Sequence, residues 1–265
     1  MAPMNITLGF SPCPNDTFMF AALVNGWIDT HGLQFDVRMD DVETLNQWAG
    51  ENRLQVTKMS FHRSLSLNTT YTLLSSGAAL GNGCGPLVIA KNTLSREEII
   101  HGQVALPGYW TTAHLLFRIF YPEAIHKSFL VFNKIEDTVL TDKAIAGVII
   151  HENRFTYADK GLVKIVDLGE AWENQTGLPI PLGGIFASRS LSPETKSLIE
   201  ALIRESIHFA WDHPDQVMPY VRQYAQEMDE EVMMSHIRLY VNDFSLDLGE
   251  KGQKSVACLK NLLPS

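Results

Sequence analysis

The chain has 265 residues, of which 45% are hydrophobic and 19% are charged, so it holds enough apolar material for a globular core. The formal net charge is −9 and no basic run is present, which argues against nucleic acid and an anionic membrane surface as partners. Cys13, Cys84 and Cys258 fit neither a disulfide framework nor a zinc ribbon and indicate a reducing compartment. Because the N-terminal segment has no leader-like pattern and no window reaches about 18 apolar residues, we expect a cytoplasmic protein without a membrane span.

Short apolar runs alternate with helix-like stretches in the first two thirds of the chain. The strand-like runs cover residues 5–10, 33–37, 54–59, 86–90, 103–106 and 144–150. The first helix-like stretches cover residues 17–24 and 42–48. This alternation predicts βαβ units, a mainly parallel sheet and therefore an α/β fold.

The last third of the chain has a helical pattern. Ser192 can cap a helix that begins at Pro193, because proline is favoured in the first turn. Further helical runs cover residues 216–226, 230–241 and 253–263. The pattern fits one domain, and it equally fits two lobes between which the chain crosses near Lys91 and returns near Gly184.

The residues just after the predicted strands are the candidates for chemistry, because parallel α/β sheets bind ligands beyond the carboxyl ends of their strands. The first strand is followed by SPCPNDT at 11–17, where Asn15 or Asp16 can cap the next helix. The third is followed by KMSFH at 58–62, which combines a lysine, a hydroxyl and an imidazole. Both segments can contact a ligand, or serve only as a turn and a helix cap.

A glycine-rich segment, GNGCGP at 81–86, superficially resembles a dinucleotide-binding loop. A strand follows the glycines where a helix would be required, so the pattern favours a tight turn over a nucleotide site. No general base is tied to Cys84 by spacing, and we expect its thiol to be inert.

The segment PGYWTTA at 107–113 lies between a strand and an amphipathic helix. Thr111 and Thr112 therefore fall at a helix N-terminus, where free N–H groups and the helix dipole favour an anion. The alternative is a threonine cap without a ligand.

His151 directly follows the apolar run at 144–150, at the expected opening of the fold. An imidazole with a pKa of about 6.5 can accept a proton at neutral pH. A helix beginning at residue 152 would keep the ring neutral, and Glu152 or Asn153 could orient it. His151 is thus a candidate general base, with a structural histidine as the alternative. No spacing typical of a metal site is present.

Five strings, in matching order over most of the chain, resemble the 1,4-dihydroxy-6-naphthoate synthases of the futalosine route to menaquinone. They are SPCPNDTFMF, TKMSFH, SGAALGNGCGPL, LPGYWTTAHLL and GVIIHENRFTY. The resemblance implies a two-lobed fold like that of the type II periplasmic solute-binding proteins, with a helical C-terminal part. Residues 1–91 and 187–265 would form a discontinuous first lobe and residues 92–186 a second, with the ligand cleft between them.

The same resemblance implies a cofactor-independent lyase. Its substrate would be cyclic dehypoxanthinylfutalosine, a small-molecule carboxylate. Cleavage of a carbon–carbon bond with aromatisation would yield 1,4-dihydroxy-6-naphthoate, with His151 as the general base and no metal. The residues expected to contact the substrate are Lys58, Met59, Ser60, Thr111, Thr112, Ala113 and Asn15. The chain departs from the family pattern at residues 63–65 and at Trp110, which can alter the shape of the cleft.

Three other functions remain open at this point. A non-catalytic binding protein for a small anion would share the fold, but the absence of a leader-like pattern argues against it. An enzyme of the chorismate dehydratase type would also share the fold, but the GVIIHENRF string favours the synthase. A metal hydrolase is the least favoured, and the oligomeric state is left open.

Overall fold

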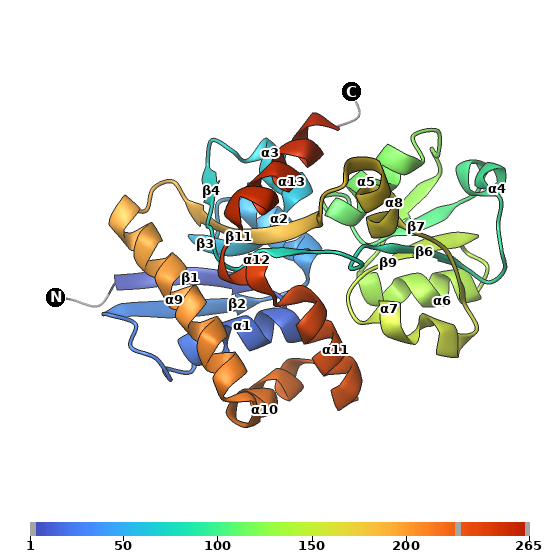
Figure 1. The fold of residues 1–265 in the computed structure, drawn as a ribbon. Coiled ribbons are helices and arrows are strands. Elements are labelled where there is room, and N and C mark those ends of the chain that lie inside the picture. Colours follow the sequence, from blue (N-terminus) through green and yellow to red (C-terminus); the bar gives the residue numbers. More distant parts are fainter. Residues whose placement is uncertain (1–3, 226–228, 263–265) are drawn as a thin grey trace.

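The computed structural model describes residues 4–225 and 229–262, and its strands form two separate sheets (Figure 1). The first has the order β2-β1-β3-β11-β4, with β5 paired to β11. Its strands are β1 (Met4–Phe10), β2 (Leu33–Met39), β3 (Val56–Ser60), β4 (Tyr71–Leu73), β5 (Ala79–Gly81) and β11 (Ile180–Ser188). The second has the order β10-β6-β9-β7-β8. Its strands are β6 (Leu87–Ala90), β7 (Val104–Leu106), β8 (Lys127–Phe129), β9 (Ala146–Ile149) and β10 (Val163–Asp167).

The sheets are mixed, so the expectation of a mainly parallel sheet is wrong. The strand β1 pairs in parallel with β2 and β3, and β7 does so with β8 and β9. By contrast, β11 runs antiparallel to β3, β4 and β5, and β6 runs antiparallel to β9 and β10. The chain reaches β6 and β11 from the other sheet, and among the described residues no helical crossover joins either strand to a preceding strand of its own sheet. The βαβ pattern therefore does not set their direction.

The chain passes twice from one sheet to the other. The first passage lies between Gly81 and Leu87, and the second lies between Asp167 and Ile180. Strand β6 lies within the expected first lobe, before the boundary at 91/92, but it pairs with the second sheet. Most of β11 lies within the expected second lobe, before the boundary at 186/187, but it pairs with the first sheet. The division into lobes at those residues stays a prediction, and the strand pairing argues for moving both boundaries toward the passages.

Helices surround both sheets (Figure 1). Those before β11 are α1 (Pro14–Val24), α2 (Val42–Gly50), α3 (Phe61–Ser66), α4 (Arg96–His101), α5 (Thr112–Phe120), α6 (Ile135–Leu140), α7 (Asn153–Thr156) and α8 (Leu168–Thr176). Two 3-10 turns, at Phe132–Lys134 and Tyr157–Lys160, complete this part of the chain.

The helical C-terminal part is confirmed. It consists of α9 (Pro193–Asp212), α10 (Pro214–Tyr224), α11 (Glu230–Tyr240), α12 (Asp243–Leu246) and α13 (Gly249–Asn261). As expected, the Ser192 side chain caps α9 by accepting a hydrogen bond from the Thr195 N–H at 3.2 Å. The expected helical runs 216–226 and 253–263 each end at a residue outside the described part of the chain. Helices α9, α10 and α11 all pack on α1, so the tail joins the first sheet.

The largest hydrophobic cluster continues from one sheet to the other. It includes Met59 and Phe186 from the first and Val88 and Leu106 from the second. A second cluster lies around α1 and the C-terminal helices. Because this apolar packing is continuous between the two sheets, it holds them in a defined arrangement relative to one another. Within the described ranges, no helix is both long enough and apolar enough to cross a membrane.

Candidate functional site

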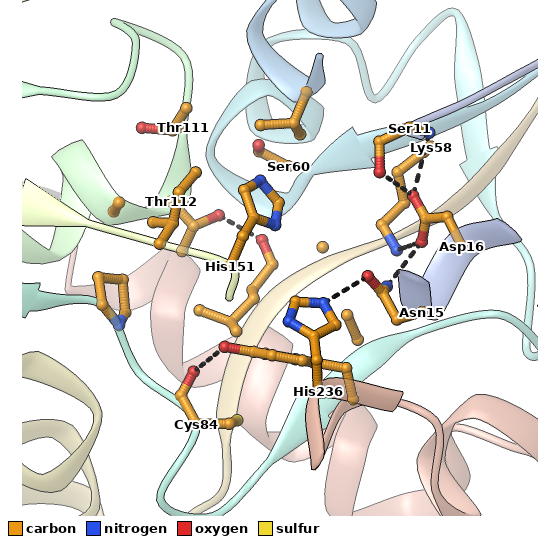
Figure 2. A pocket seen from close by; sticks show the side chains of 18 residues that line it. Ser11, Asn15, Asp16, Lys58, Ser60, Cys84, Thr111, Thr112, His151 and His236 are labelled. Carbon is orange, nitrogen blue, oxygen red and sulfur yellow. Dashed lines mark hydrogen bonds and ion pairs between the residues drawn. The ribbon is translucent and has the colours of Figure 1, made fainter. Parts of the chain in front are cut away.

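A pocket opens between the two sheets, and side chains from both of them line it (Figure 2). Its empty space, counted together with the solvent-filled mouth, is about 650 Å³. The segment after β1, the end of β3 and the segment after β9 meet here with the beginning of α5 and one face of α11. The polar side chains of its wall include Ser11, Asn15, Asp16, Lys58, Ser60, Thr111, Thr112, His151, His236 and Tyr240.

His151 lies just beyond the end of β9 and points into this pocket (Figure 2). Its φ angle of 60° is in the left-handed region, which costs a non-glycine residue about 1–3 kcal/mol. Phe132 packs edge-on against the ring, with 4.8 Å between ring centroids. The Nε2 atom is buried and has no hydrogen-bond partner among the described residues.

The imidazole of His151 is neutral at pH 7. Burial lowers its pKa to about 4, although the nearby Asp16 carboxylate acts in the opposite direction. The sequence suggested neutrality through a helix dipole, but α7 has only four residues and burial is the larger cause. A neutral imidazole with an unpartnered, buried nitrogen can accept a proton from a bound molecule.

Cys13 is a neighbour of His151 that the sequence did not reveal. Its Sγ atom lies 3.4 Å from His151 Nδ1. Burial raises the pKa of the Cys13 thiol well above its usual value, so the group stays protonated. Asn153, one of the two residues that the sequence offered for orienting the ring, instead donates to Glu136 Oε2 at 2.5 Å. The contact on the Nδ1 side of His151 therefore comes from the other sheet.

Ligand atoms of Cys13, His151 and Glu152 lie within 4.8 Å of one another. Sulfur, imidazole nitrogen and carboxylate oxygen are all donors that zinc accepts. The raised pKa of Cys13 disfavours the thiolate that a zinc ion would require. The expectation that the site works without a metal stays a prediction. Burial also raises the pKa of Cys84 to about 12, in agreement with an inert thiol.

A buried ion pair joins Lys58 to Asp16, with 2.7 Å between Nζ and Oδ1. Asp16 Oδ1 also accepts a hydrogen bond from Asn15 Nδ2 at 2.8 Å. Asp16 Oδ2 accepts two more, from the Ser11 backbone N–H at 3.1 Å and the Ser11 hydroxyl at 2.7 Å. Lys58 and Asn15 do line the pocket, as expected of substrate contacts. The Lys58 ammonium and the Asn15 amide nitrogen are nevertheless hydrogen-bonded to Asp16, so the lysine charge is largely compensated before any ligand binds.

Ser60 and Met59, neighbours in β3, have different surroundings. Asn46 Nδ2 donates to Ser60 Oγ at 3.0 Å, and no acceptor for the Ser60 hydroxyl hydrogen is found in the described part of the chain. Ser60 can therefore donate to a ligand. The Met59 side chain packs in the hydrophobic core and does not line the pocket, because successive strand residues point to opposite faces.

Thr111, Thr112 and Ala113 bring the N-terminus of α5 to the pocket wall. Thr111 caps the helix, and its Oγ1 atom accepts from the His114 N–H at 3.2 Å. The Thr112 hydroxyl donates to the Leu182 carbonyl at 2.6 Å and so ties α5 to β11. The positive end of the α5 dipole thus faces the pocket, as the anion-binding interpretation requires.

His236 and Tyr240 contribute a wall that the sequence did not predict. Both lie on α11, and His236 is fully buried. His236 Nε2 is 2.9 Å from Asn15 Oδ1, and its ring centroid is 6.2 Å from that of His151. A signal is present in the sequence, because His236 shares a helical stripe with Met233, Ile237 and Tyr240. The stripe shows that His236 is buried, but not what it faces.

Known proteins are similar to this chain in both sequence and fold. A family described as menaquinone biosynthesis matches residues 6–264. A 1,4-dihydroxy-6-naphtoate synthase from Thermus thermophilus is 44% identical over 254 residues, which is 96% of this chain and 92% of that protein. The crystal structure of protein AF1704 from Archaeoglobus fulgidus has a TM-score of 0.92 and 34% identity, covering 97% of this chain and 96% of that one.

A more distant similarity concerns the fold alone. The alkanesulfonate-binding protein SsuA from Xanthomonas axonopodis pv. citri has a TM-score of 0.69 at 10% identity. The match covers 100% of this chain and 96% of that one. The two-lobed fold expected from the sequence is therefore confirmed as similar to that of periplasmic binding proteins.

Proposed function

The chain belongs to the menaquinone biosynthesis family, and from this premise we propose that it acts as a 1,4-dihydroxy-6-naphthoate synthase. The proposed reaction converts cyclic dehypoxanthinylfutalosine by carbon–carbon bond cleavage and aromatisation, which makes the protein a lyase. One observation above all supports this choice. A neutral imidazole, that of His151, presents an unpartnered nitrogen to a pocket that also receives a helix N-terminus.

His151 is proposed to start the reaction as a general base. Its Nε2 atom would remove a proton that the substrate's carbonyl group makes acidic, which requires the hydrogen of the neutral ring to reside on Nδ1. The Ser60 hydroxyl and the beginning of α5 would stabilise the oxyanion that develops. Cleavage of the carbon–carbon bond then follows, and aromatisation of the product makes it favourable.

The substrate carboxylate is proposed to bind at the N-terminus of α5, near Thr112 and Ala113. This position suits an anion, because the ammonium group of Lys58 is already paired with Asp16. Asn15 and Lys58 then act by shaping the polar wall. The Met59 side chain packs in the hydrophobic core, so its position does not favour the expected contact with the substrate.

The cytoplasm is the proposed site of the reaction. Cys13, Cys84 and Cys258 are all free thiols, which suits a reducing compartment. Closure of the two sheets around the pocket would keep water away from the reacting molecule.

An assay with two substrates tests the proposed function. The purified protein is incubated separately with cyclic dehypoxanthinylfutalosine and with chorismate, and the naphthoate chromophore is followed. We expect the chromophore with the first compound and no consumption of the second. Turnover of chorismate would favour the dehydratase type of enzyme, and retention of a ligand without turnover would favour a binding protein.

A further inference from the structure

A chain of hydrogen bonds determines which nitrogen of His236 carries its proton. Asp16 accepts hydrogen bonds from Lys58 at Oδ1 and from Ser11 at Oδ2, so both of its carboxylate oxygens act as acceptors. The contact between Asn15 and Asp16 at 2.8 Å must then be made by the amide nitrogen of Asn15. The amide oxygen of Asn15 is thereby turned toward His236, 2.9 Å from its Nε2 atom. An amide oxygen can only accept, so His236 Nε2 must donate.

The other nitrogen of His236 consequently bears a lone pair. A neutral imidazole has one donor and one acceptor nitrogen, and Nε2 is the donor here. Burial, together with the neighbouring His151, keeps the pKa of His236 well below its usual value, so the ring does not take a second proton near neutral pH. The Nδ1 atom is buried and lacks a partner within residues 4–225 and 229–262. Such an unpaired buried acceptor destabilises the folded protein unless a ligand pairs with it.

The orphaned nitrogen belongs to a ring in the pocket wall. His236 lines the same cavity as His151, and Figure 2 shows the two rings close to one another. We propose that His236 Nδ1 is a fixed hydrogen-bond acceptor for a hydroxyl group of the substrate, which makes His236 a specificity-determining residue. This inference rests on the function proposed above and adds a recognition contact to it.

The acceptor atom, His236 Nδ1, determines which chemical group of the substrate can bind to it. Only a donor can pair with Nδ1, so this part of the pocket selects an alcohol and disfavours a carboxylate or a ketone at the same place. The carboxylate of the substrate therefore belongs at the α5 end and a hydroxyl at the α11 end. The ring centroids of His236 and His151 are 6.2 Å apart, so the hydroxyl lies within a few bonds of the reacting carbon.

Two amide substitutions separate the two nitrogens of His236. In His236→Gln, the amide nitrogen can replace Nε2 and still donate to Asn15, but the acceptor at the Nδ1 position is lost. In His236→Asn, the shorter amide can place its oxygen near the Nδ1 position, while the donor to Asn15 is lost. We expect His236→Gln to lower kcat/KM for the hydroxylated substrate about 10- to 100-fold, mainly through KM, and His236→Asn to lower it less.

Analogues of cyclic dehypoxanthinylfutalosine that each lack one hydroxyl group complete the test. With one of them, wild-type kcat/KM should fall by a similar factor, and His236→Gln should cause no further loss. Equal activity of His236→Gln and wild type on the complete substrate would overturn the inference. So would an equal additional loss with every analogue. If wild type forms no naphthoate at all, the proposed function itself fails, and the ligand assignment with it.

The tautomer can be measured without turnover. In ¹⁵N-histidine-labelled protein without ligand, His236 should show a protonated Nε2 and an unprotonated Nδ1. Addition of the substrate to the His151→Asn variant should shift the Nδ1 resonance in the direction of an accepted hydrogen bond. A protonated Nδ1 in the free protein would refute the inference, whatever the activity of the variants.

Discussion

The sulfur atom of Cys13 lies 3.4 Å from Nδ1 of His151, although the two residues are 138 positions apart in the chain. The loop after β1 thus supports the ring of a residue that follows β9, in the other sheet. If Nδ1–H donates to the sulfur, Nε2 keeps its lone pair and can act as a base. Cys13 is therefore a positioning residue for His151 under the proposed function.

Removal of the thiol should affect turnover more than binding. We expect Cys13→Ala to lower kcat about 10-fold with little change in KM, because His151 loses the partner of its Nδ1 atom. Cys13→Ser keeps a polar partner and should lie between Cys13→Ala and wild type. Steady-state kinetics measures both values, and Cys258→Ala, outside the pocket, serves as the control. Wild-type kcat in Cys13→Ala would rule out the positioning role.

Replacement of the proposed base should abolish most of the activity and leave the fold intact. His151→Asn should lower kcat by about 10²–10⁴-fold, the usual contribution of a positioned general base. Asparagine tolerates the left-handed backbone conformation at this position, so the free energy of unfolding should not fall. Turnover and urea denaturation are measured on the same preparation. Undiminished turnover in a folded variant would exclude His151 as the base.

The activity should persist in mild acid. The base form of His151 is the neutral ring, and burial lowers the pKa of this ring to about 4. The acid limb of the kcat/KM profile should therefore fall toward pH 4, below the pKa of about 6.5 of a free histidine. A pH profile over the range in which the protein stays folded measures this limb. An apparent pKa at or above that of free histidine would contradict the burial of the ring in the working enzyme.

The stability of the fold should decrease as the pH falls below about 6.5. Burial lowers the pKa of four histidines in the folded state: that of His62, His114 and His151 to about 4, and that of His236 well below its usual value. Below about pH 6.5 the unfolded chain binds protons that the folded chain does not, so each of these residues removes about 1.4 kcal/mol of unfolding free energy per pH unit. For the first three, the loss levels off as the pH falls below their folded-state pKa.

Urea denaturation at several pH values between about 4.5 and 6.5 measures this slope. His114→Gln should reduce the slope by about 1.4 kcal/mol per pH unit, because one of the buried titrating rings is gone. The exposed His208 provides the matched control, and His208→Gln should leave the slope unchanged. Equal slopes in all three proteins would show that His114 titrates normally in the folded state.

A chelator should not affect turnover. Cys13 is the softest of the three potential metal ligands, and the raised pKa of its thiol disfavours the ligating form. We expect no stoichiometric metal by elemental analysis and full activity after exhaustive dialysis against a chelator. Loss of activity that zinc restores would reverse the expectation of a metal-independent reaction.

The sequence by itself determined the local features of this protein. Apolar runs, capping residues and helical spacing predicted β1, β3, β9, the start of α5 and the helical tail, because these depend on neighbouring residues. Residue types at strand ends also identified Ser60, Thr112 and His151 as lining candidates. The resemblance of five strings indicated the family and the fold.

Only the tertiary structure decided how distant segments meet. The antiparallel direction of β6 and β11 depends on how the chain passes between the sheets, which no local pattern records. The meeting of Cys13 with His151, and of Asn15 with His236, depends on packing across the pocket. Met59, expected among the substrate contacts, packs in the core, because the sequence shows that a strand residue is buried but not whether it faces core or pocket. Burial in the assembled fold also gives the His151 ring its low pKa.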